Sequence, residues 1–307
     1  KKLGGIRMKK RRILLSMALV VMALLVVSSS AFAVSDAVED AVNDYFANLP
    51  EDNAMIGEEA FVEKLKAGED LFVLDIRQPD VYNEGHVKGA VNLPWGPDAI
   101  ADNLDKLPAD ETIYVYCYTG QTANQTVGLL NFAGFETKSV RFGWNLGISK
   151  VDGYEEIVET SSNELGEVTD YEINPEIKTA VVDYFKGLAD VSDSMYKNYK
   201  ISEDMLKMAL DSDADMMVVS IRQASAYAEG HIEGAVNIPW GAGMEQYFGQ
   251  LPQDKKLVIY CYTGQTAGQT VAGLRMLGYD AVSLNGGMGT PMNEPYGWSN
   301  KGYEVVQ

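Results

Sequence analysis

The octapeptide YCYTGQTA occurs twice in this sequence, at 116–123 and again at 260–267. It contains the only two cysteines of the chain, Cys117 and Cys261, so every thiol lies in one of two identical segments. A thiolate is a nucleophile, and its reactivity depends on how its surroundings stabilise the negative charge. Two thiols in separate, equivalent loops are poorly suited to a structural disulfide, so we interpret both as reactive cysteines.

The residues around each cysteine predict a buried strand followed by a helix. Ile113–Cys117 is apolar or aromatic up to the thiol, which is typical of a strand covered on both faces, and helical spacing begins at Ala123. Ligands of parallel sheets bind outside the carboxyl ends of the strands. We therefore expect Cys117 in a strand-to-helix turn, where unpaired N–H groups and the helix dipole favour an anion such as a thiolate.

Neutral residues that can donate hydrogen bonds follow each cysteine, and a glycine allows the backbone to turn its amides inward. We expect these residues to hold the sulfur and whatever it carries. In the first loop they are Tyr118, Thr119, Gly120, Gln121 and Thr122; in the second they are Tyr262, Thr263, Gly264, Gln265 and Thr266.

Two arginines, Arg77 and Arg222, follow the end of another strand in each half and are predicted to face the cysteine loops. They either hold the loop or the substrate, or form a structural ion pair, for example between Arg77 and Asp75. The second half has Ser220 in place of Asp75. If Asp75 carries its charge close to Cys117, we expect Cys261 to be the more reactive thiol.

An internal repeat defines the organisation of the chain. The segment LDIRQPDVYNEGHVKGAVNLPWG from Leu74 returns as VSIRQASAYAEGHIEGAVNIPWG from Val219. A polar, acidic stretch at 160–176 separates the copies and is typical of a linker. The predicted parts are a leader with its upstream residues (1–33), a first domain (34–165) and a second domain (166–307).

Short apolar runs alternate with helical patterns in both copies, which predicts an α/β fold in which each domain has a small parallel sheet flanked by helices. In the first copy the expected strands are Leu71–Ile76, Ala90–Leu93, Ile113–Cys117 and Ser139–Phe142, and the expected helices are Glu58–Lys66 and Ala123–Phe132. In the second copy the expected strands are Met217–Ile221 and Leu257–Cys261, with a helix at Gln265–Leu277.

The first 33 residues have the layout of a secretory signal peptide. Translation is expected to start at Met8, four basic residues follow, an apolar stretch runs over Ile13–Val27, and cleavage is expected after Ala33. An uncleaved membrane anchor is the alternative, because no charge occurs from Ile13 to Ser35. We expect an exported protein, either periplasmic, at the cell surface or secreted, with no membrane contact once the leader is removed.

The composition excludes some partners. The formal net charge is −19, and removal of the seven basic residues of the leader would bring it to about −26. Such an acidic protein is a poor ligand for nucleic acid or anionic lipid. We expect a monomer that works on small molecules.

Taken together and in order, the motifs DIR…GHVKGAVNLPW and CYTGQT in the first half, and SIR…GHIEGAVNIPW, CYTGQT and LNGGM in the second, resemble those of the tandem rhodaneses. The resemblance covers nearly all of 34–307. It implies a sulfurtransferase whose cysteine takes sulfane sulfur from thiosulfate, polysulfide or a persulfide. The cysteine holds it as a persulfide and passes it to a thiol or a cyanide-like acceptor, without a metal or an organic cofactor. A rhodanese module that carries persulfide or docks a partner without turnover is the alternative.

The sequence departs from the family at loop positions that are often cationic in thiosulfate enzymes, since Tyr118–Thr119 and Tyr262–Thr263 are neutral. The resemblance implies structural roles for His86 and His231, the only histidines. Trp95 and Trp240 are expected to pack in the core or to line the site. A cysteine phosphatase or an arsenate reductase would need a C-x5-R loop, and the sequence disfavours both because alanine occupies the arginine position in each loop.

Overall fold

The structure, a computed structural model, describes residues 34–307, so the predicted leader lies outside the described residues. We call residues 34–165 the first half and residues 166–307 the second half. The elements of the first half are α2 (Asp36–Ala47), β1 (Met55–Ile56), α3 (Glu58–Lys66), β2 (Phe72–Asp75), α4 (Pro79–Glu84), β3 (His86–Val87), β4 (Val91–Asn92), β5 (Ile113–Tyr116), α5 (Gln121–Phe132), β6 (Thr137–Val140) and β7 (Val158–Glu159). Those of the second half are α6 (Pro175–Lys186), β8 (Lys200–Ile201), α7 (Glu203–Asp211), β9 (Met216–Ser220), α8 (Ala224–Glu229), β10 (Val236–Asn237), β11 (Lys256–Tyr260), α9 (Gln265–Met276) and β12 (Ala281–Leu284).

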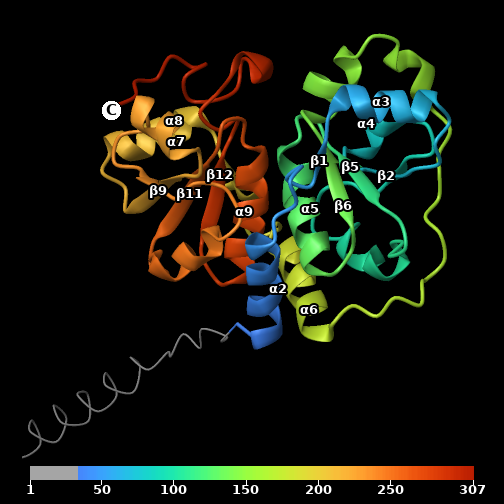
Figure 1. The fold of residues 1–307 in the computed structure, drawn as a ribbon, viewed down its shortest axis with the longest axis horizontal. Helices are drawn as coiled ribbons and strands as arrows, with labels where there is room; N and C mark the ends of the chain where they lie inside the picture. Colours follow the sequence, from blue (N-terminus) through green and yellow to red (C-terminus); the bar gives the residue numbers. More distant parts are fainter. Residues whose placement is uncertain (1–33) are drawn as a thin grey trace, which may run out of the picture. The chain divides into compact units, whose positions relative to one another are not determined.

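Each half contains one five-stranded parallel sheet, with the strand orders β1-β6-β5-β2-β4 and β10-β9-β11-β12-β8. Helices flank both sheets (Figure 1). The predicted α/β fold of two repeated domains is confirmed. The two orders correspond strand for strand when the second is read in reverse, and the strand that precedes each cysteine lies at the centre of its sheet.

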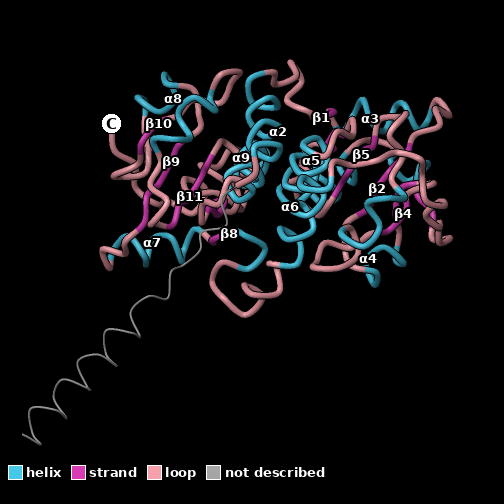
Figure 2. The backbone as a smooth tube through the Cα atoms, turned by 90° about the horizontal axis from the view of Figure 1, so that it is seen from below, coloured by secondary structure: helices cyan, strands magenta, loops and turns pink. Residues whose placement is uncertain are grey.

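The helices that follow the cysteines, α5 and α9, lie side by side between the two sheets (Figures 1 and 2). Both are buried along nearly their whole length, since each is covered by its own sheet on one side and by the other helix on the other. One continuous hydrophobic core runs from the first half through this contact into the second. The two cysteine loops therefore begin from the same interface.

The first helix of each half packs against the other half. In α2, Phe46 lies 6.0 Å from Trp240 between ring centroids, and its carbonyl accepts a hydrogen bond from Gly243 N at 3.2 Å. In α6, Phe185 lies 5.6 Å from Trp95, and Lys186 forms an ion pair at 2.7 Å with Asp98. Because the two halves exchange these helices, each supplies part of the other's core.

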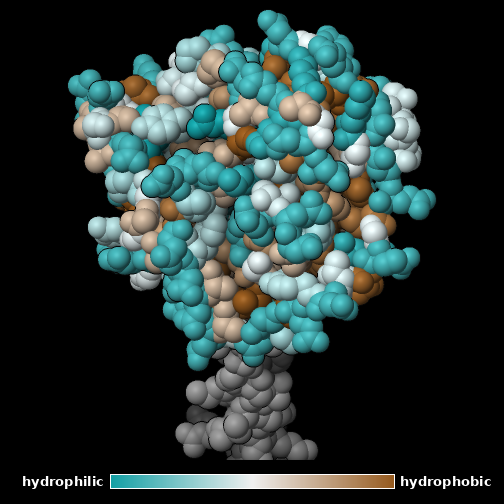
Figure 3. Space-filling view, turned by 45° about the vertical axis from the view of Figure 1, so that its right-hand side comes forward, coloured by the Kyte–Doolittle hydropathy of each residue, from teal (hydrophilic) through white to brown (hydrophobic). Residues whose placement is uncertain are grey.

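The described surface is mostly hydrophilic on the face drawn in Figure 3, with isolated apolar residues between polar ones. Within residues 34–307, no helix is long and apolar enough to cross a bilayer.

Candidate functional site

The first thiol lies where the sequence predicts it, directly after β5 and at the N-terminus of α5. The Cys117 Sγ atom accepts hydrogen bonds from the backbone N–H groups of Gly120 at 3.1 Å and Ala123 at 3.4 Å. Cys117 is only 2% exposed. Two amides of one turn thus point at the sulfur, an arrangement that stabilises a thiolate or the outer sulfur of a persulfide.

The second thiol lies in an equivalent strand-to-helix turn, between β11 and α9. The Cys261 Sγ atom accepts a hydrogen bond from Gly264 N at 3.1 Å and is part of a residue that is 3% exposed. Gly264 has a φ of 84°, matching the 88° of Gly120, so a left-handed residue precedes each helix. This conformation is why the loops need glycine at that position.

A second segment in each half, 143–145 in the first, holds the backbone of the cysteine loop through hydrogen bonds. Trp144 N donates to Cys117 O and Asn145 N donates to Tyr118 O, both at 2.8 Å. Gly143, with a φ of 60°, comes so close that a Cβ there would lie 2.4 Å from Cys117 O. In the second half the same place is taken by Gly287, the second glycine of the LNGGM motif. These contacts hold the cysteine backbone rigidly.

Gln121 and Gln265, both predicted to hold substrate, reach across to the other half. Gln121 Nε2 donates to Ser283 Oγ at 2.7 Å and to the Leu284 carbonyl at 3.0 Å. Gln265 Oε1 accepts from Phe142 N at 3.0 Å. Both side chains are buried. Their visible role is to tie each cysteine loop to the opposite half, and a contact with substrate stays a prediction.

The other predicted loop residues lie around the thiols with different exposure. The Tyr118 hydroxyl accepts from Gln78 N at 3.1 Å, and the Tyr262 hydroxyl accepts from Gln223 N at 3.4 Å. Tyr262 is 41% exposed. Thr119, Thr263 and Thr266 are half-buried and Thr122 is buried. Their contact with a donor also stays a prediction.

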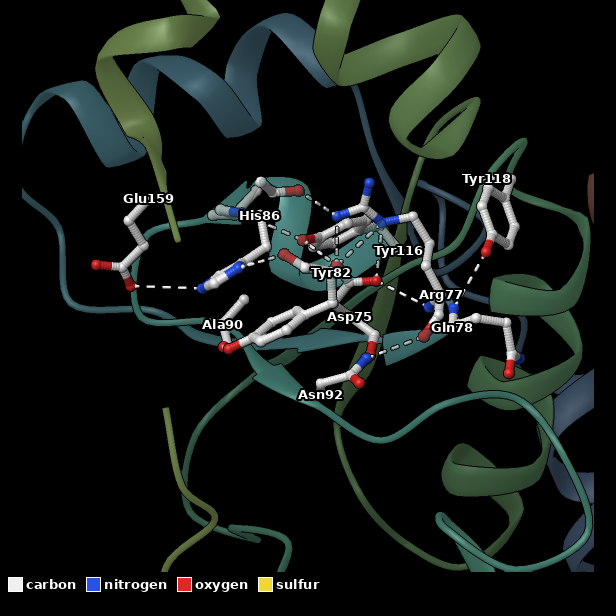
Figure 4. Close-up of polar contacts among 12 residues, drawn as sticks. Asp75, Arg77, Gln78, Tyr82, His86, Ala90, Asn92, Tyr116, Tyr118 and Glu159 are labelled. Atoms are coloured by element: carbon white, nitrogen blue, oxygen red, sulfur yellow. Dashed lines mark hydrogen bonds and ion pairs between the residues drawn. The ribbon is translucent and has the colours of Figure 1, made fainter. Parts of the chain in front are cut away.

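Arg77 is engaged by a carboxylate (Figure 4). Its Nε and Nη2 atoms donate to Asp75 at 2.6–3.0 Å, and Nη2 also donates to Gly85 O at 2.8 Å. The hydroxyl of Tyr116 donates to the same carboxylate at 2.7 Å. Burial and the Asp75 charge raise the pKa of Tyr116, so it remains a donor. This geometry matches the structural ion pair, one of the two roles left open by the sequence.

The Asp75 cluster lies on the other face of its sheet from the thiol. Tyr116 packs in a small core with Phe61 and Val140, whereas Cys117 belongs to the large core of the interface. Because Asp75 is neutralised by Arg77 and points to the Tyr116 side, it does not act as the free charge near Cys117 on which the expected order of thiol reactivity depends.

Lys200 is a basic residue on the strand against which the Cys117 loop docks, and the sequence analysis missed it. It is half-buried on β8 and is the register partner of Ser283, the residue to which the Cys117 loop is tied through Gln121. Residues paired across neighbouring strands project from the same face of the sheet, so the lysine side chain leaves from the face on which that loop docks. Burial lowers the pKa of Lys200, and negative charge at Cys117 and at Glu203 acts in the opposite direction.

The counterpart of Lys200 in the first half is Met55, since Met55 pairs with Ser139 as Lys200 pairs with Ser283. Met55 is buried and neutral. The two thiols therefore have identical loops but different opposite walls. The only signal in the sequence would be this Met-to-Lys difference at equivalent positions of the repeat, far from either cysteine.

The histidines and tryptophans take part in packing. His86 stacks on Tyr82 at 3.6 Å, and its ring nitrogens lie 2.9 and 3.0 Å from the carbonyls of Tyr82 and Ser161. His231 stacks on Tyr227 at 3.9 Å. Trp95 packs on Phe185, as described above. Among residues 34–307, no three His, Cys, Asp or Glu side chains come together as a metal site.

Comparison with known families agrees with this architecture of two α/β domains, each with a thiol in a strand-to-helix turn. The family model described as the rhodanese-like domain matches residues 58–147 and, a second time, residues 202–289. The two matches lie one in each half and together cover more than half of the chain. The chain belongs to the rhodanese family and contains two rhodanese-like domains in tandem.

Curated relatives carry names from sulfur chemistry. Thiosulfate sulfurtransferase GlpE of Shewanella oneidensis is 34% identical over 73 residues, which are 24% of this chain and 71% of that protein. The putative sulfur carrier protein YrkF of Bacillus subtilis is 28% identical over 90 residues, 29% of this chain and 45% of that protein, so the match spans less than half of it. A rhodanese-related protein of Thermoplasma volcanium is a similar solved structure, with 25% identity and a TM-score of 0.30 over 35% of this chain and 96% of that one.

Proposed function

We propose that this protein is an exported sulfurtransferase with two active cysteines, Cys117 and Cys261. The observation that carries the proposal is the amide cradle. Gly120 N and Ala123 N point at one sulfur, and Gly264 N points at the other. Such a cradle stabilises the anionic sulfur on which sulfane transfer depends.

The transfer has two steps. The cysteine thiolate attacks the outer sulfur of the donor, a new S–S bond forms, and the donor's own bond to that sulfur breaks. With thiosulfate the leaving group is sulfite, which takes the electron pair, and the enzyme keeps an anionic persulfide. A thiolate or cyanide then attacks the outer sulfur and releases the cysteine thiolate. Charge and electrons balance without a redox partner, a metal or an organic cofactor.

Lys200 supports an anionic donor at the first site. The cysteine loops themselves are neutral, and the acidic surface repels an anion before it reaches them. Lys200, from the opposite half, supplies a positive charge at Cys117 that offsets the lack of charge in the loop and the repulsion by the acidic surface. Its counterpart Met55 supplies no such charge at Cys261. The first site would therefore prefer thiosulfate and other anionic donors, and the second less charged ones such as organic persulfides.

Export rests on the leader pattern of residues 1–33 and on the acidic composition of the remainder. The expected partners are a small sulfur donor and a thiol acceptor, met by a monomer outside the cytoplasm. Nucleic acid is not a partner in this proposal.

The burial of both thiols favours a second candidate, a module that carries persulfide or docks a partner without turnover. Residues that are 2% and 3% exposed admit a donor only through a narrow approach or after a loop movement.

Steady-state sulfur transfer from thiosulfate to cyanide separates the two candidates. The wild-type chain turns over, and the Cys117→Ser, Cys261→Ser double variant does not, since serine keeps the shape and loses the nucleophile. Wild-type protein that acquires one sulfur per thiol and then stops would favour the carrier module, and turnover that survives in the double variant would refute the catalytic role of both cysteines.

A further inference from the structure

The second domain contains a buried arginine that lacks the counter-ion of its repeat partner. Arg222 is 5% exposed, and its Nη2 atom donates to the Gly230 carbonyl, as Arg77 donates to Gly85. Its Nε atom, however, is buried without a hydrogen-bond partner among the described residues. Within residues 34–307, Arg222 forms no ion pair, whereas Arg77 is held by Asp75.

The frame around the two arginines is the same. In the first domain Asn92 Nδ2 bridges the carbonyls of Asp75 and Arg77, and Val87 N donates to the Tyr116 hydroxyl. In the second, Asn237 bridges the carbonyls of Ser220 and Arg222, and Ile232 N donates to the Tyr260 hydroxyl. The distance from the guanidinium carbon to the tyrosine ring centroid is 5.3 Å in one case and 5.5 Å in the other. The donors thus occupy equivalent places.

In the first domain four donors converge on the Asp75 carboxylate: the backbone N, Nε and Nη2 of Arg77 and the hydroxyl of Tyr116 (Figure 4). The second domain keeps Arg222 and Tyr260 but replaces the carboxylate with Ser220. The serine hydroxyl accepts only a long bond of 3.4 Å from Arg222 N. Arg222 Nε and the Tyr260 hydroxyl proton have no protein acceptor among the described residues.

We infer that the second domain binds a small inorganic anion, chloride in a physiological medium, where the Asp75 carboxylate lies in the first. A buried cation requires a compensating negative charge, and the donors left over by the change from aspartate to serine are those that surround a carboxylate. Because serine has fewer side-chain atoms than aspartate, the space released by this replacement suits a single small ion rather than a larger anion. Arg222 Nε, the Tyr260 hydroxyl and the Ser220 hydroxyl would donate to it.

The anion would stabilise the second domain next to its cysteine loop. Arg222 also lies 5.9 Å from the ring centroid of Tyr262, the residue after Cys261, and Gln223 N donates to the Tyr262 hydroxyl. The inference does not depend on sulfur transfer, because it rests on a charge that must be balanced whether or not the thiol turns over.

Two measurements on the purified protein, expressed with its full sequence, test the inference. In crystals soaked in sodium bromide, anomalous scattering should show a bromide ion within hydrogen-bond distance of Arg222 Nε. In solution, replacing sodium gluconate with sodium chloride at equal ionic strength should raise Tm by about 3 °C once chloride is ten-fold above its Kd.

Reciprocal variants are the matched controls. Ser220→Asp supplies the missing carboxylate and should abolish both the bromide peak at Arg222 and the chloride-dependent rise in Tm. Asp75→Ser should create a second chloride-dependent site at Arg77. If Asp75→Ser does not fold, the wild-type and Ser220→Asp results decide alone.

Three results would overturn the inference. Equal Tm in chloride and gluconate, with no bromide peak at Arg222, would mean that water satisfies the arginine. A bromide peak without a chloride effect in solution would show an adventitious ion only. A chloride effect that persists unchanged in Ser220→Asp would place the ion elsewhere.

Discussion

Gly143→Ala should slow the reaction of the first thiol although the cysteine itself is unchanged. The new Cβ would lie 2.4 Å from Cys117 O and 2.9 Å from Gly120 N, where ordinary contact begins at 3.4 Å. The cysteine loop must therefore move by about 1 Å. A displacement of that size at reacting groups costs about 100-fold in rate, and the φ of 60° adds about 1–2 kcal/mol of backbone strain for any residue with a Cβ.

The assay is the rate at which Cys117 gains sulfur from thiosulfate, followed by intact mass in a Cys261→Ser background. Gly89→Ala is the matched control, because Gly89 has a φ of 75° and a Cβ there would meet nothing within 4 Å. It introduces similar strain without a clash at the thiol. Sulfur loading at Cys261 in a Cys117→Ser, Gly143→Ala variant reports that the chain is folded.

We expect Gly143→Ala to load Cys117 about 100-fold more slowly than Gly89→Ala, with Cys261 little affected. If the two alanine variants load Cys117 at rates within a factor of two, neither the position of the loop nor its amide cradle controls the transfer.

Two further predictions concern the contacts between the halves. Lys200→Met should slow thiosulfate loading of Cys117 about ten-fold, because one partly screened charge contributes roughly 1.4 kcal/mol. Met55→Lys should speed up thiosulfate loading of Cys261 for the same reason. Equal loading rates in the wild type and in Lys200→Met would show that the lysine does not act on the Cys117 site. Gln121→Ala deletes hydrogen bonds of 2.7 and 3.0 Å to the second half. Ser283 Oγ stays buried without this partner, while the Leu284 carbonyl keeps its bond from Gly287 N. Urea unfolding should show a loss of about 2 kcal/mol, and a loss below about 0.5 kcal/mol would show that water replaces the glutamine.

Local sequence patterns predicted the fold because apolar runs and helical spacing are the features that decide where strands and helices form. The helix expected at 58–66 is α3 residue for residue, and the strand expected at 113–117 is β5 with its last residue in the loop. The strand expected at 139–142 lies two residues earlier, at 137–140. The two-residue edge strands β1 and β8 were missed, because two residues are too few to show an alternating hydrophobic pattern.

The loop around each thiol was predictable from the octapeptide, but its surroundings were not. The exchange of α2 and α6 between halves and the cross-links through Gln121 and Gln265 join residues that lie 88 or more positions apart, which no local pattern reports. The same holds for Lys200. Burial of the thiols also follows from this exchange, because the opposite half covers each loop.

Intact-mass analysis of the two single-cysteine variants shows whether each thiol accepts sulfane sulfur. After exposure of Cys117→Ser and Cys261→Ser to thiosulfate, and separately to an organic persulfide, each protein should gain one sulfur atom that is released by a small thiol. Thiosulfate should load the variant that retains Cys117 faster than the one that retains Cys261. The absence of any sulfur gain in both variants with both donors would mean that neither cysteine is a sulfur acceptor.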